Sequence, residues 1–429
     1  MSLPRQILVL GYVWPEPNSS AAGKHMLSLL QAFQSAGWSI TFASPALKGE
    51  HKIDLIALGI KEQKIALNCS SFDTFITELQ PSIVLFDRFM LEEQFGWRVA
   101  QCCPQALRIL DTEDMHSLRN ARHQALKQQR QINLDDLNSE QAKREIAAIF
   151  RCDLSLIISD FEFQLLQSHY NVPANLLIHT PFMLELDKVA LPKTDYSQRQ
   201  HFICIGNFRH EPNWDAVLWL KQTIWPLIRQ QLPLAELHVY GAYPPPKATQ
   251  LHNVKQGFII KGWALDAEQV MAQARVCLAP LRFGAGIKGK LTEAMLCGTP
   301  SITTCVGREG MGRVPINELS KSALNWPGKY IEFDVVQQDS VAQQLALAAV
   351  DLYQNQQQWQ ACQQLGFSWL KQNFDGQIIS SSLLSRIDSL MSSLEHHRAT
   401  NFIGQMLQHH QFKSTQYMAQ WIEAKNKAN

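Results

Sequence analysis

A glycine- and lysine-rich stretch in the second half of the chain decides the fold: residues 279–295 read APLRFGAGIKGKLTEAM. The stretch follows an apolar run typical of a buried strand. The helix pattern that it opens ends at Gly298-Thr299-Pro300. A strand, a glycine-rich loop and a helix in this order are typical of a parallel α/β domain that binds an anion at the loop.

The residues of this loop suit a phosphate group. Glycines let the backbone approach a ligand closely, and the N–H groups at a helix N-terminus attract negative charge. Two lysines add positive charge, and a glutamate one turn further along could reach a sugar hydroxyl of the same ligand. The stretch therefore predicts a phosphate cradle, for which the simpler alternative is a glycine-rich turn with solvated lysines. The residues concerned are Gly284, Gly286, Gly289, Lys288, Lys290 and Glu293.

The same loop comes within one residue of a nucleotide-binding P-loop. Gly284-x4-Gly289-Lys290 has the required spacing, but Leu291 stands where the Ser or Thr that ligates Mg²⁺ belongs. A P-loop usually also follows the first strand of its domain, whereas this loop follows the fourth predicted strand. The sequence therefore disfavours an ATPase or a kinase.

Outward from this loop, short apolar runs alternate with longer amphipathic ones. This alternation predicts βαβ units, and apolar runs without strict alternation indicate parallel strands buried on both faces. The predicted strands are 6–13, 38–44, 53–58, 82–87, 106–111, 154–159 and 175–180, then 201–206, 235–241, 257–262, 275–280 and 300–304. The predicted helices are 20–36, 90–103, 116–150, 161–170, 213–231, 265–274, 289–297, 339–371 and 376–394, followed by a tail of one or two helices.

These elements divide the chain into two doubly wound Rossmann-like domains. We predict an N-terminal domain over 1–183, a linker over 184–200, a C-terminal domain over 201–375, and a crossing helix with a helical tail over 376–429. Ligands of parallel sheets bind at the carboxyl ends of the strands. The loops that carry chemistry should therefore face a cleft between the two domains.

Composition excludes several other classes of protein. The 429 residues include 39 basic and 38 acidic ones, which argues against bulk electrostatic binding to nucleic acid. No apolar run approaches the ~18–20 residues of a membrane-spanning helix, and Ile7–Trp14 is expected to form a first strand, not a signal peptide. The nine cysteines show no CxxC spacing, so we expect neither a disulfide framework nor a zinc site, and a cytoplasmic location.

Several motifs together resemble the group 1 glycosyltransferases of the GT-B fold, family 4, which retain anomeric configuration. The resemblance covers most of residues 1–395. It is strongest over Phe283–Thr304 with Gly307-Arg308-Glu309-Gly310, and it includes the loop Gly206–Ala216 and the glycines Gly241 and Gly262.

The resemblance implies transfer of a sugar from a nucleotide diphosphate donor to an acceptor hydroxyl. In such enzymes the residue corresponding to Glu293 holds the donor ribose, and those corresponding to Lys288 and Arg209 neutralise the departing diphosphate. Preorganised cations of this kind are usually a large catalytic term. Two departures from the family pattern are Ala285, where many members have a second glutamate, and Pro212-Asn213, where a lysine is usual.

Two loops of the N-terminal half also match the family. The loop Tyr12–Lys24, with Gly23 near its end, is similar to the family's first loop, which lies against the donor phosphate; the alternative is an ordinary βα loop capped by Ser19 or Ser20. The segment Asp111–His116 resembles an acidic segment whose final histidine faces the reacting sugar. His116 could accept a hydrogen bond from a sugar hydroxyl or shuttle protons, unless Asp114 merely caps a helix and His116 is solvated.

The sequence shows no Asp-x-Asp pair and no metal-ligand spacing, so we predict a reaction without a metal or another cofactor. The expected partners are a nucleotide-sugar donor and a glycan or lipid-linked acceptor of surface polysaccharide assembly, with peripheral membrane contact as an open alternative. An epimerase of the same fold, or a catalytically silent sugar-binding scaffold, remains the rival interpretation.

Other conspicuous residues favour plain structural roles. The cations of the helix after His116 suit a solvated helix face better than an anionic acceptor or a membrane. The remaining histidines are expected at the surface, and the aromatic residues of the tail are expected to pack. These residues are Arg119, Arg122, Lys127 and Arg130; His210, His396, His397, His409 and His410; and Phe402, Phe412, Tyr417 and Trp421.

Overall fold

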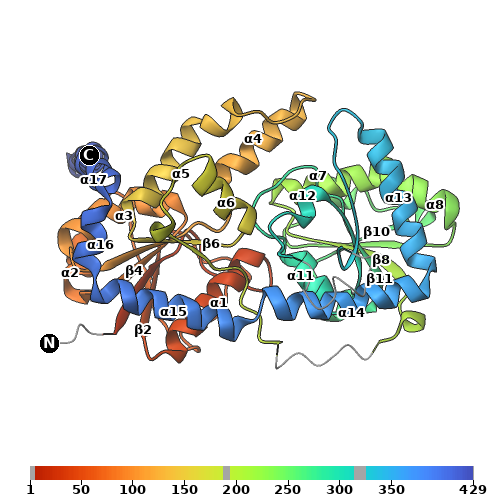
Figure 1. The fold of residues 1–429 in the computed structure, drawn as a ribbon, viewed down its shortest axis with the longest axis horizontal. Coiled ribbons are helices and arrows are strands. Elements are labelled where there is room, and N and C mark those ends of the chain that lie inside the picture. The colour runs from red at the N-terminus through yellow and green to blue at the C-terminus, as the bar shows by residue number, and fades with distance from the viewer. Residues whose placement is uncertain (1–4, 187–193, 314–324, 429) are drawn as a thin grey trace.

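Two parallel α/β domains lie side by side and are linked by two chain crossings (Figure 1). The computed structural model describes residues 5–186, 194–313 and 325–428. Part of the predicted linker lies outside these residues. The fold confirms the predicted architecture of two Rossmann-like domains with a helical C-terminal region.

Seven parallel strands form the sheet of the N-terminal domain among the described residues. Their order is β3-β2-β1-β4-β5-β6-β7, with helices on both faces. The strands are β1 (Gln6–Leu10), β2 (Ser39–Ser44), β3 (Lys61–Lys64), β4 (Ile83–Asp87), β5 (Leu107–Asp111), β6 (Leu154–Ile157) and β7 (Leu177–His179). The helices are α1 (Ala21–Ser35), α2 (Ser71–Leu79), α3 (Phe89–Cys102), α4 (His116–Lys127), α5 (Glu140–Arg151) and α6 (Asp160–Ser168).

Six parallel strands form the second sheet of the described chain, in the order β10-β9-β8-β11-β12-β13. They are β8 (His201–Ile205), β9 (Leu237–Tyr240), β10 (Phe258–Gly262), β11 (Ala274–Ala279), β12 (Ser301–Thr304) and β13 (Gly328–Ile331). The helices are α7 (Glu211–Trp219), a π-helical turn Leu220–Ile224, α8 (Trp225–Gln231), α9 (Pro246–Thr249), α10 (Ala267–Gln273), α11 (Gly289–Leu296), α12 (Cys305–Arg308), α13 (Gln338–Gln354) and α14 (Gln356–Asn373).

Several predicted elements were wrong. Residues 53–58 form no strand, with turns from residue 55 onward, and the edge strand is the polar segment β3, which pairs on one side with β2. Leu55 is nevertheless fully buried, so it is apolar because it packs into the core from a turn. The prediction missed α2 and β13. It also merged α4 with α5 and α13 with α14, where the side chain of Asn355 caps a new helix by accepting from the N–H of Gln358.

The chain crosses between the domains at two adjacent points. Leu184 and Asp375 form a parallel bridge, with the N–H of Leu184 donating to Phe374 and that of Gly376 donating to Leu184. Beyond this bridge, helix α15 (Gly376–Ser392) runs back beneath the N-terminal domain. It inserts Leu383, Ile387 and Leu390 into that domain's core.

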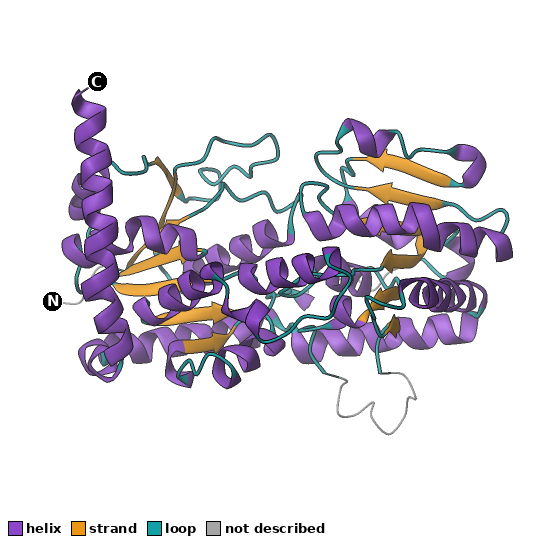
Figure 2. Cartoon of the chain, turned by 90° about the horizontal axis from the view of Figure 1, so that it is seen from above, coloured by secondary structure: helices purple, strands orange, loops and turns teal. Residues whose placement is uncertain are grey.

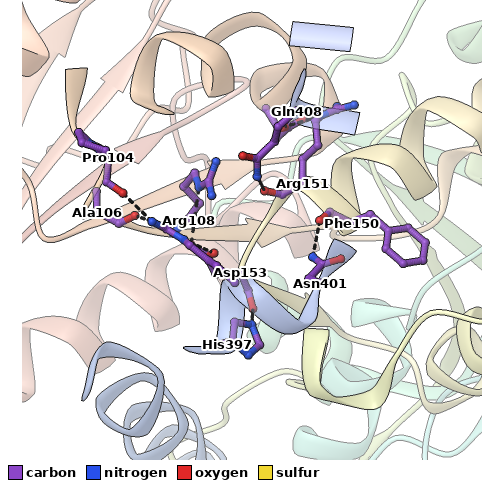
Figure 3. Close-up of polar contacts among 11 residues, drawn as sticks. Pro104, Ala106, Arg108, Phe150, Arg151, Asp153, His397, Asn401 and Gln408 are labelled. Atoms are coloured by element: carbon purple, nitrogen blue, oxygen red, sulfur yellow. Dashed lines mark hydrogen bonds and ion pairs between the residues drawn. The ribbon is translucent and has the colours of Figure 1, made fainter. Parts of the chain in front are cut away.

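The tail continues as α16 (Leu394–Thr400) and α17 (Phe402–Ala428), and polar contacts fix it to the N-terminal domain (Figure 3). Arg398 makes two 2.7 Å bonds to the carboxylate of Asp153, which is 3% exposed, and also donates to the carbonyls of Pro104 and Ala106. His397 is buried with Nε2 2.8 Å from the Asp153 carbonyl, which corrects its predicted surface position. The tail is therefore an integral part of this domain.

Helix α17 crosses the domain closely and then projects past it (Figure 2). Asn401 and Gln408 donate to the carbonyls of Phe150 and Arg151 (Figure 3). A Cβ on Gly404 would lie 2.2 Å from the Phe150 carbonyl oxygen, so glycine is required at this crossing. None of the helices in the described part of the chain combines the length and apolar character needed to span a bilayer.

Replacing Arg398 with alanine should lower the free energy of unfolding by about 1–3 kcal/mol, because the buried carboxylate of Asp153 loses a charge partner and two carbonyls lose their donor. Urea unfolding of the purified protein measures this loss. Arg386→Ala is the matched control, since Arg386 is partly exposed and donates to one carbonyl, that of Asn175. We expect the control to stay within about 0.5 kcal/mol of the parent; equal losses would contradict the role assigned to Arg398.

Candidate active site between the domains

A cavity of about 850 Å³ lies between the two domains, at the carboxyl ends of both sheets. Its walls are the loops that follow β1, β4 and β5 on one side and β8, β9, β10 and β11 on the other. Of the residues predicted for the site, it brings together His116, Arg209, Gly284, Lys288, Lys290 and Glu293. Gly23 and Gly286 do not line it.

Glycines of the loop Gly284–Lys290, which we call the donor loop after its expected ligand, also let the domains approach each other. Gly286 has a φ of +64°, and a Cβ there would lie 2.8 Å from the Cβ of Asp114 in the N-terminal domain. A Cβ on Gly289 would lie 2.6 Å from that of Ala21. Gly23 has a similar role within its own domain, where a Cβ would lie 2.5 Å from the Glu16 backbone. Close approach of backbone, more than ligand contact, therefore requires glycine at these positions.

Glu162 holds the donor loop from the opposite domain. Its buried carboxylate accepts hydrogen bonds from the N–H of Gly286, at 2.7 Å, and from that of Met115, at 3.2 Å. Burial raises the pKa of Glu162, and these two bonds partly offset that rise. One carboxylate thus ties the donor loop to the loop that precedes His116. The sequence prediction missed it, because a glutamate two residues after a helix start resembles an ordinary first-turn acid.

The loops after β8 and β11 are joined by Lys290 and Asn213. Nζ of Lys290 donates to Oδ1 of Asn213 at 2.6 Å, and Nδ2 of Asn213 donates to the carbonyl of Asn207. Gly206 lies beneath this contact, where a Cβ would be 2.7 Å from Asn213. The asparagine at the place of the usual family lysine therefore orients Lys290 and adds no charge.

Positive charge converges on the cavity. Lys288 is 7% exposed and donates to the carbonyl of Gly286, and burial lowers its pKa to about 8. Burial also lowers the pKa of Lys290. Arg209 lies 3.6 Å from the ring centroid of Tyr243. With Arg119 on the opposite wall, these cations create a potential suited to a multiply charged anion.

His116 faces this cationic wall across the cavity. Burial lowers its pKa to about 4, helped by the guanidinium of Arg88, so its imidazole is neutral at pH 7. The carboxylate of Glu145 fixes the start of its helix by accepting from the N–H groups of His116 and Ser117 at 2.7 and 2.8 Å. The alternative in which Asp114 caps the helix is not observed, since no side-chain cap bond forms there.

Glu293 is engaged by the other domain. Lys24 of α1 forms an ion pair with its carboxylate, and the carboxylate partner keeps the pKa of Lys24 raised despite burial. Both residues line this cavity and also a second, adjacent cavity of about 860 Å³. Any ligand hydroxyl that binds Glu293 must share this carboxylate with Lys24.

Three residues of the cleft were predicted to be solvated, but in the structure they contact the other domain or line the cavity. Arg122 donates to both carboxylate oxygens of Glu309 and to the Gly284 carbonyl in the C-terminal domain. Arg119 pairs with Asp114 and lines the cavity. His210 also lines it, and burial between cations lowers its pKa to about 3. Arg130, which pairs with Asp136 at the far end of α4, is half exposed as expected of a surface residue.

A buried charged cluster lies behind His116. Nδ1 of His25 is 3.5 Å from a carboxylate oxygen of Glu113 and 3.8 Å from one of Asp111, and all three side chains are buried. Burial alone would lower the pKa of His25, but Asp111 and Glu113 outweigh it and raise the pKa to about 9. Their ligand atoms lie within 4.8 Å of one another, so a cation could fit. The imidazolium already supplies positive charge there, together with nearby Arg88.

Comparison with known proteins defines the class. Residues 199–327 match the family described as glycosyl transferases group 1. No curated protein sequence matches the chain. In fold, it is similar to sucrose-phosphate synthase from Thermosynechococcus elongatus, with a TM-score of 0.64 and 16% identity over 90% of this chain and 99% of that one.

Two further structures support the same fold. The Anabaena protein HepE, solved in complex with UDP, has a TM-score of 0.62 and 12% identity over 90% of this chain and 100% of its own. WaaG, a glycosyltransferase involved in lipopolysaccharide biosynthesis, has a TM-score of 0.58 and 12% identity over 88% of this chain and 98% of its own. The fold and the family match together identify a glycosyltransferase of the GT-B fold.

The stability of the fold should fall as the pH rises from about 6.5 to 9. Over this range folded His25, with a pKa of about 9, holds a proton that an unfolded histidine releases, so unfolding becomes more favourable, by on the order of 3 kcal/mol at most. Asp111, whose pKa burial raises to about 8, acts in the same direction. Urea unfolding at several pH values measures the decline.

The variant Asp111→Asn should show a shallower decline, because it removes the strongest carboxylate neighbour of His25 and one titrating group. His169→Asn is the control, and it should keep the slope of the parent. A parent protein whose stability is flat between pH 6.5 and 9 would contradict the charge state assigned to the cluster.

Proposed function

We propose that the protein transfers a sugar from a nucleotide diphosphate donor to an acceptor hydroxyl, with retention of anomeric configuration and without a metal ion. One observation carries the proposal: Lys288, Lys290 and the N-terminus of α11 form a cationic wall opposite His116, with Glu293 one turn further along the helix. The Anabaena protein HepE, of the same fold, has been solved with UDP and with UDP-glucose. A UDP-sugar is therefore the first donor to test.

The cavity suggests how each part of the donor would lie. The diphosphate suits the cationic wall, where the helix N-terminus and two ammonium groups favour anions. The ribose suits Glu293, whose carboxylate accepts hydrogen bonds. The base would then reach the loop after β10, which lines the cavity at Trp263 and Leu265. This order places the sugar near Gly284 and His116.

The proposed chemistry relies on preorganised charge. As the bond between sugar and diphosphate breaks, negative charge accumulates on the leaving group, and Lys288 with Arg209 would neutralise it. His116, neutral at pH 7, would accept or donate a hydrogen bond at a sugar hydroxyl. Its low pKa does not suit an acid that must be protonated at neutral pH, so proton shuttling is not part of this proposal.

The proposed reaction predicts chelator-insensitive release of UDP from UDP-glucose, and an NMR spectrum of the product that shows the anomeric configuration of the donor. An inverted product would contradict retention, and loss of activity with chelator would contradict metal independence. Conversion of the donor to an epimer without UDP release would favour the epimerase. Neither turnover nor thermal stabilisation with UDP-, GDP- and ADP-sugars would favour the silent scaffold.

Lys288 should make UDP binding depend on pH. An anion beside Lys288 favours its protonated form, so the affinity for UDP should fall as the pH rises through about 8. Lys288→Met should bind UDP more weakly, with an affinity that changes little over the same range. Isothermal titration between pH 7 and 9 measures both. Equal pH dependence in the variant and the parent would remove Lys288 from the diphosphate site.

His116→Ala should lower kcat by roughly 10²-fold or more with little change in UDP affinity, because a contact to the reacting sugar acts mainly in the transition state. Steady-state kinetics and UDP titration measure the two effects. His169→Ala is a matched control, since His169 lies at the C-terminal end of α6 and does not line the cavity. Parent-like turnover in His116→Ala would exclude a role at the sugar.

A further inference from the structure

The outer face of α17 carries an unusual concentration of exposed apolar side chains. Among the described residues, twenty large apolar side chains are exposed, and six of them lie on this one helix, each between 45% and 73% exposed. Three of the four exposed large aromatic side chains are among these six. The six residues are Phe402, Ile403, Met406, Tyr417, Met418 and Trp421. This corrects the prediction that Phe402, Tyr417 and Trp421 pack, whereas the side chain of Phe412 lies outside the described part of the chain.

The opposite side of the same helix packs against the N-terminal domain. Gly404 and Gln408 meet the backbone at the end of α5, and Leu407 packs against the domain core. Ala419 packs on Trp97 of α3. These contacts, together with the Arg398 anchor one turn before the helix, fix the rotation of α17. The apolar side chains therefore point away from the domain because the opposite side of the helix is packed against it.

Charge on α17 is distributed unequally between the two sides. Lys413 and Lys425 are exposed, with Nζ of Lys425 5.3 Å from the ring centroid of Trp421. Glu423 is the single acidic residue of the helix, and it accepts a hydrogen bond from Ser70 of the domain. The outer face thus combines aromatic rings, aliphatic side chains and lysines with no carboxylate.

We infer that the outer face of α17 binds the surface of an anionic lipid bilayer. Aromatic rings and long lysine side chains suit the headgroup region, where the rings enter the acyl boundary and the ammonium groups meet lipid phosphates. The two apolar groups of the face, at residues 402–406 and 417–421, lie roughly 16 Å apart along the helix axis. A helix lying flat in the interface would bury both at once.

A second copy of the chain fits this face less well. A two-fold contact places like residues near each other. Lys413 lies between the two apolar groups, so a symmetric pairing would bring Lys413 against its own copy in the middle of the contact. A bilayer of anionic lipids offers charge complementarity at the same place. The inference does not depend on the proposed transfer reaction, because α17 contributes no residue to the cavity.

Sedimentation of the full-length protein with vesicles tests the inference. The protein should sediment with vesicles of equimolar phosphatidylcholine and phosphatidylglycerol, and much less with vesicles of phosphatidylcholine alone. Binding should weaken as salt is added, because the lysine contribution is screened. A protein that stays in the supernatant with the anionic vesicles would overturn the inference.

Matched variants locate the binding surface. Tyr417→Ser with Trp421→Ser should weaken binding at least tenfold, and Lys413→Gln with Lys425→Gln should abolish the preference for the anionic vesicles. Phe402→Ser with Met406→Ser provides an independent variant should the first fail to fold. The control is Leu234→Ser with Leu347→Ser, which removes two exposed leucines from the C-terminal domain. It should bind as the parent does.

Light scattering distinguishes membrane binding from the alternative that α17 contacts a second copy of the chain. The parent should be monomeric in solution without lipid. A dimer that the Tyr417→Ser and Trp421→Ser double variant converts to a monomer would overturn the inference and assign the face to contact between copies. Parent-like vesicle binding by both aromatic variants would overturn it as well.

Discussion

The whole active site depends on how closely the two domains touch at the donor loop. Gly286 and Gly289 face Asp114 and Ala21 of the opposite domain at distances that leave no room for a Cβ. The Glu162 carboxylate then bonds the Gly286 N–H across the same boundary. The same carboxylate also accepts from the N–H of Met115, so one residue links the donor loop to the loop that precedes His116. A shift of one domain would displace both reacting surfaces together.

The two departures from the pattern of the family that the sequence resembles lie close to this contact. Ala285 takes the place of a glutamate that many members carry, and the loop around it is instead bonded by Glu162 from the other domain. Asn213, at the place of a usual lysine, orients Lys290. The chain thus keeps charged groups at the donor loop but draws one of them from a distant part of the sequence. Such an exchange cannot be read from the loop alone.

The sequence was sufficient to predict the two-domain architecture and those cavity residues that lie close together in a single loop and the helix after it. Lys288, Lys290 and Glu293 lie within six residues, so their local spacing placed them correctly on one side of the cavity. Residues whose role depends on the opposite domain were missed, as with Lys24 and Glu162. Arg122 looked like a solvated side chain because its partner Glu309 is distant in sequence. Arg119 and His210 looked solvated because the cavity that they line forms only in the folded chain. For the apolar residues of the tail the error was the opposite one, because residues expected to be buried are exposed. Periodicity shows that a helix face is apolar but not what covers it.

The N-terminal domain contains buried polar atoms without hydrogen-bond partners at the edge that faces the cavity. Neither ring nitrogen of His25 has a hydrogen-bond partner among the described residues, and one oxygen each of Asp87, Asp111 and Glu162 also lacks one. Buried polar atoms of this kind normally cost stability. Here the carboxyl groups lie at the ends of β4 and β5 and at the start of α6, and His25 lies on α1 beside them. The carboxyl groups of Asp87, Asp111 and Glu113 raise the pKa values of Arg88 and His25, which stay positively charged near a neutral His116. Selection for a fixed electrostatic environment at the cavity accounts for this loss of stability better than selection for the fold, which an apolar edge would serve equally well.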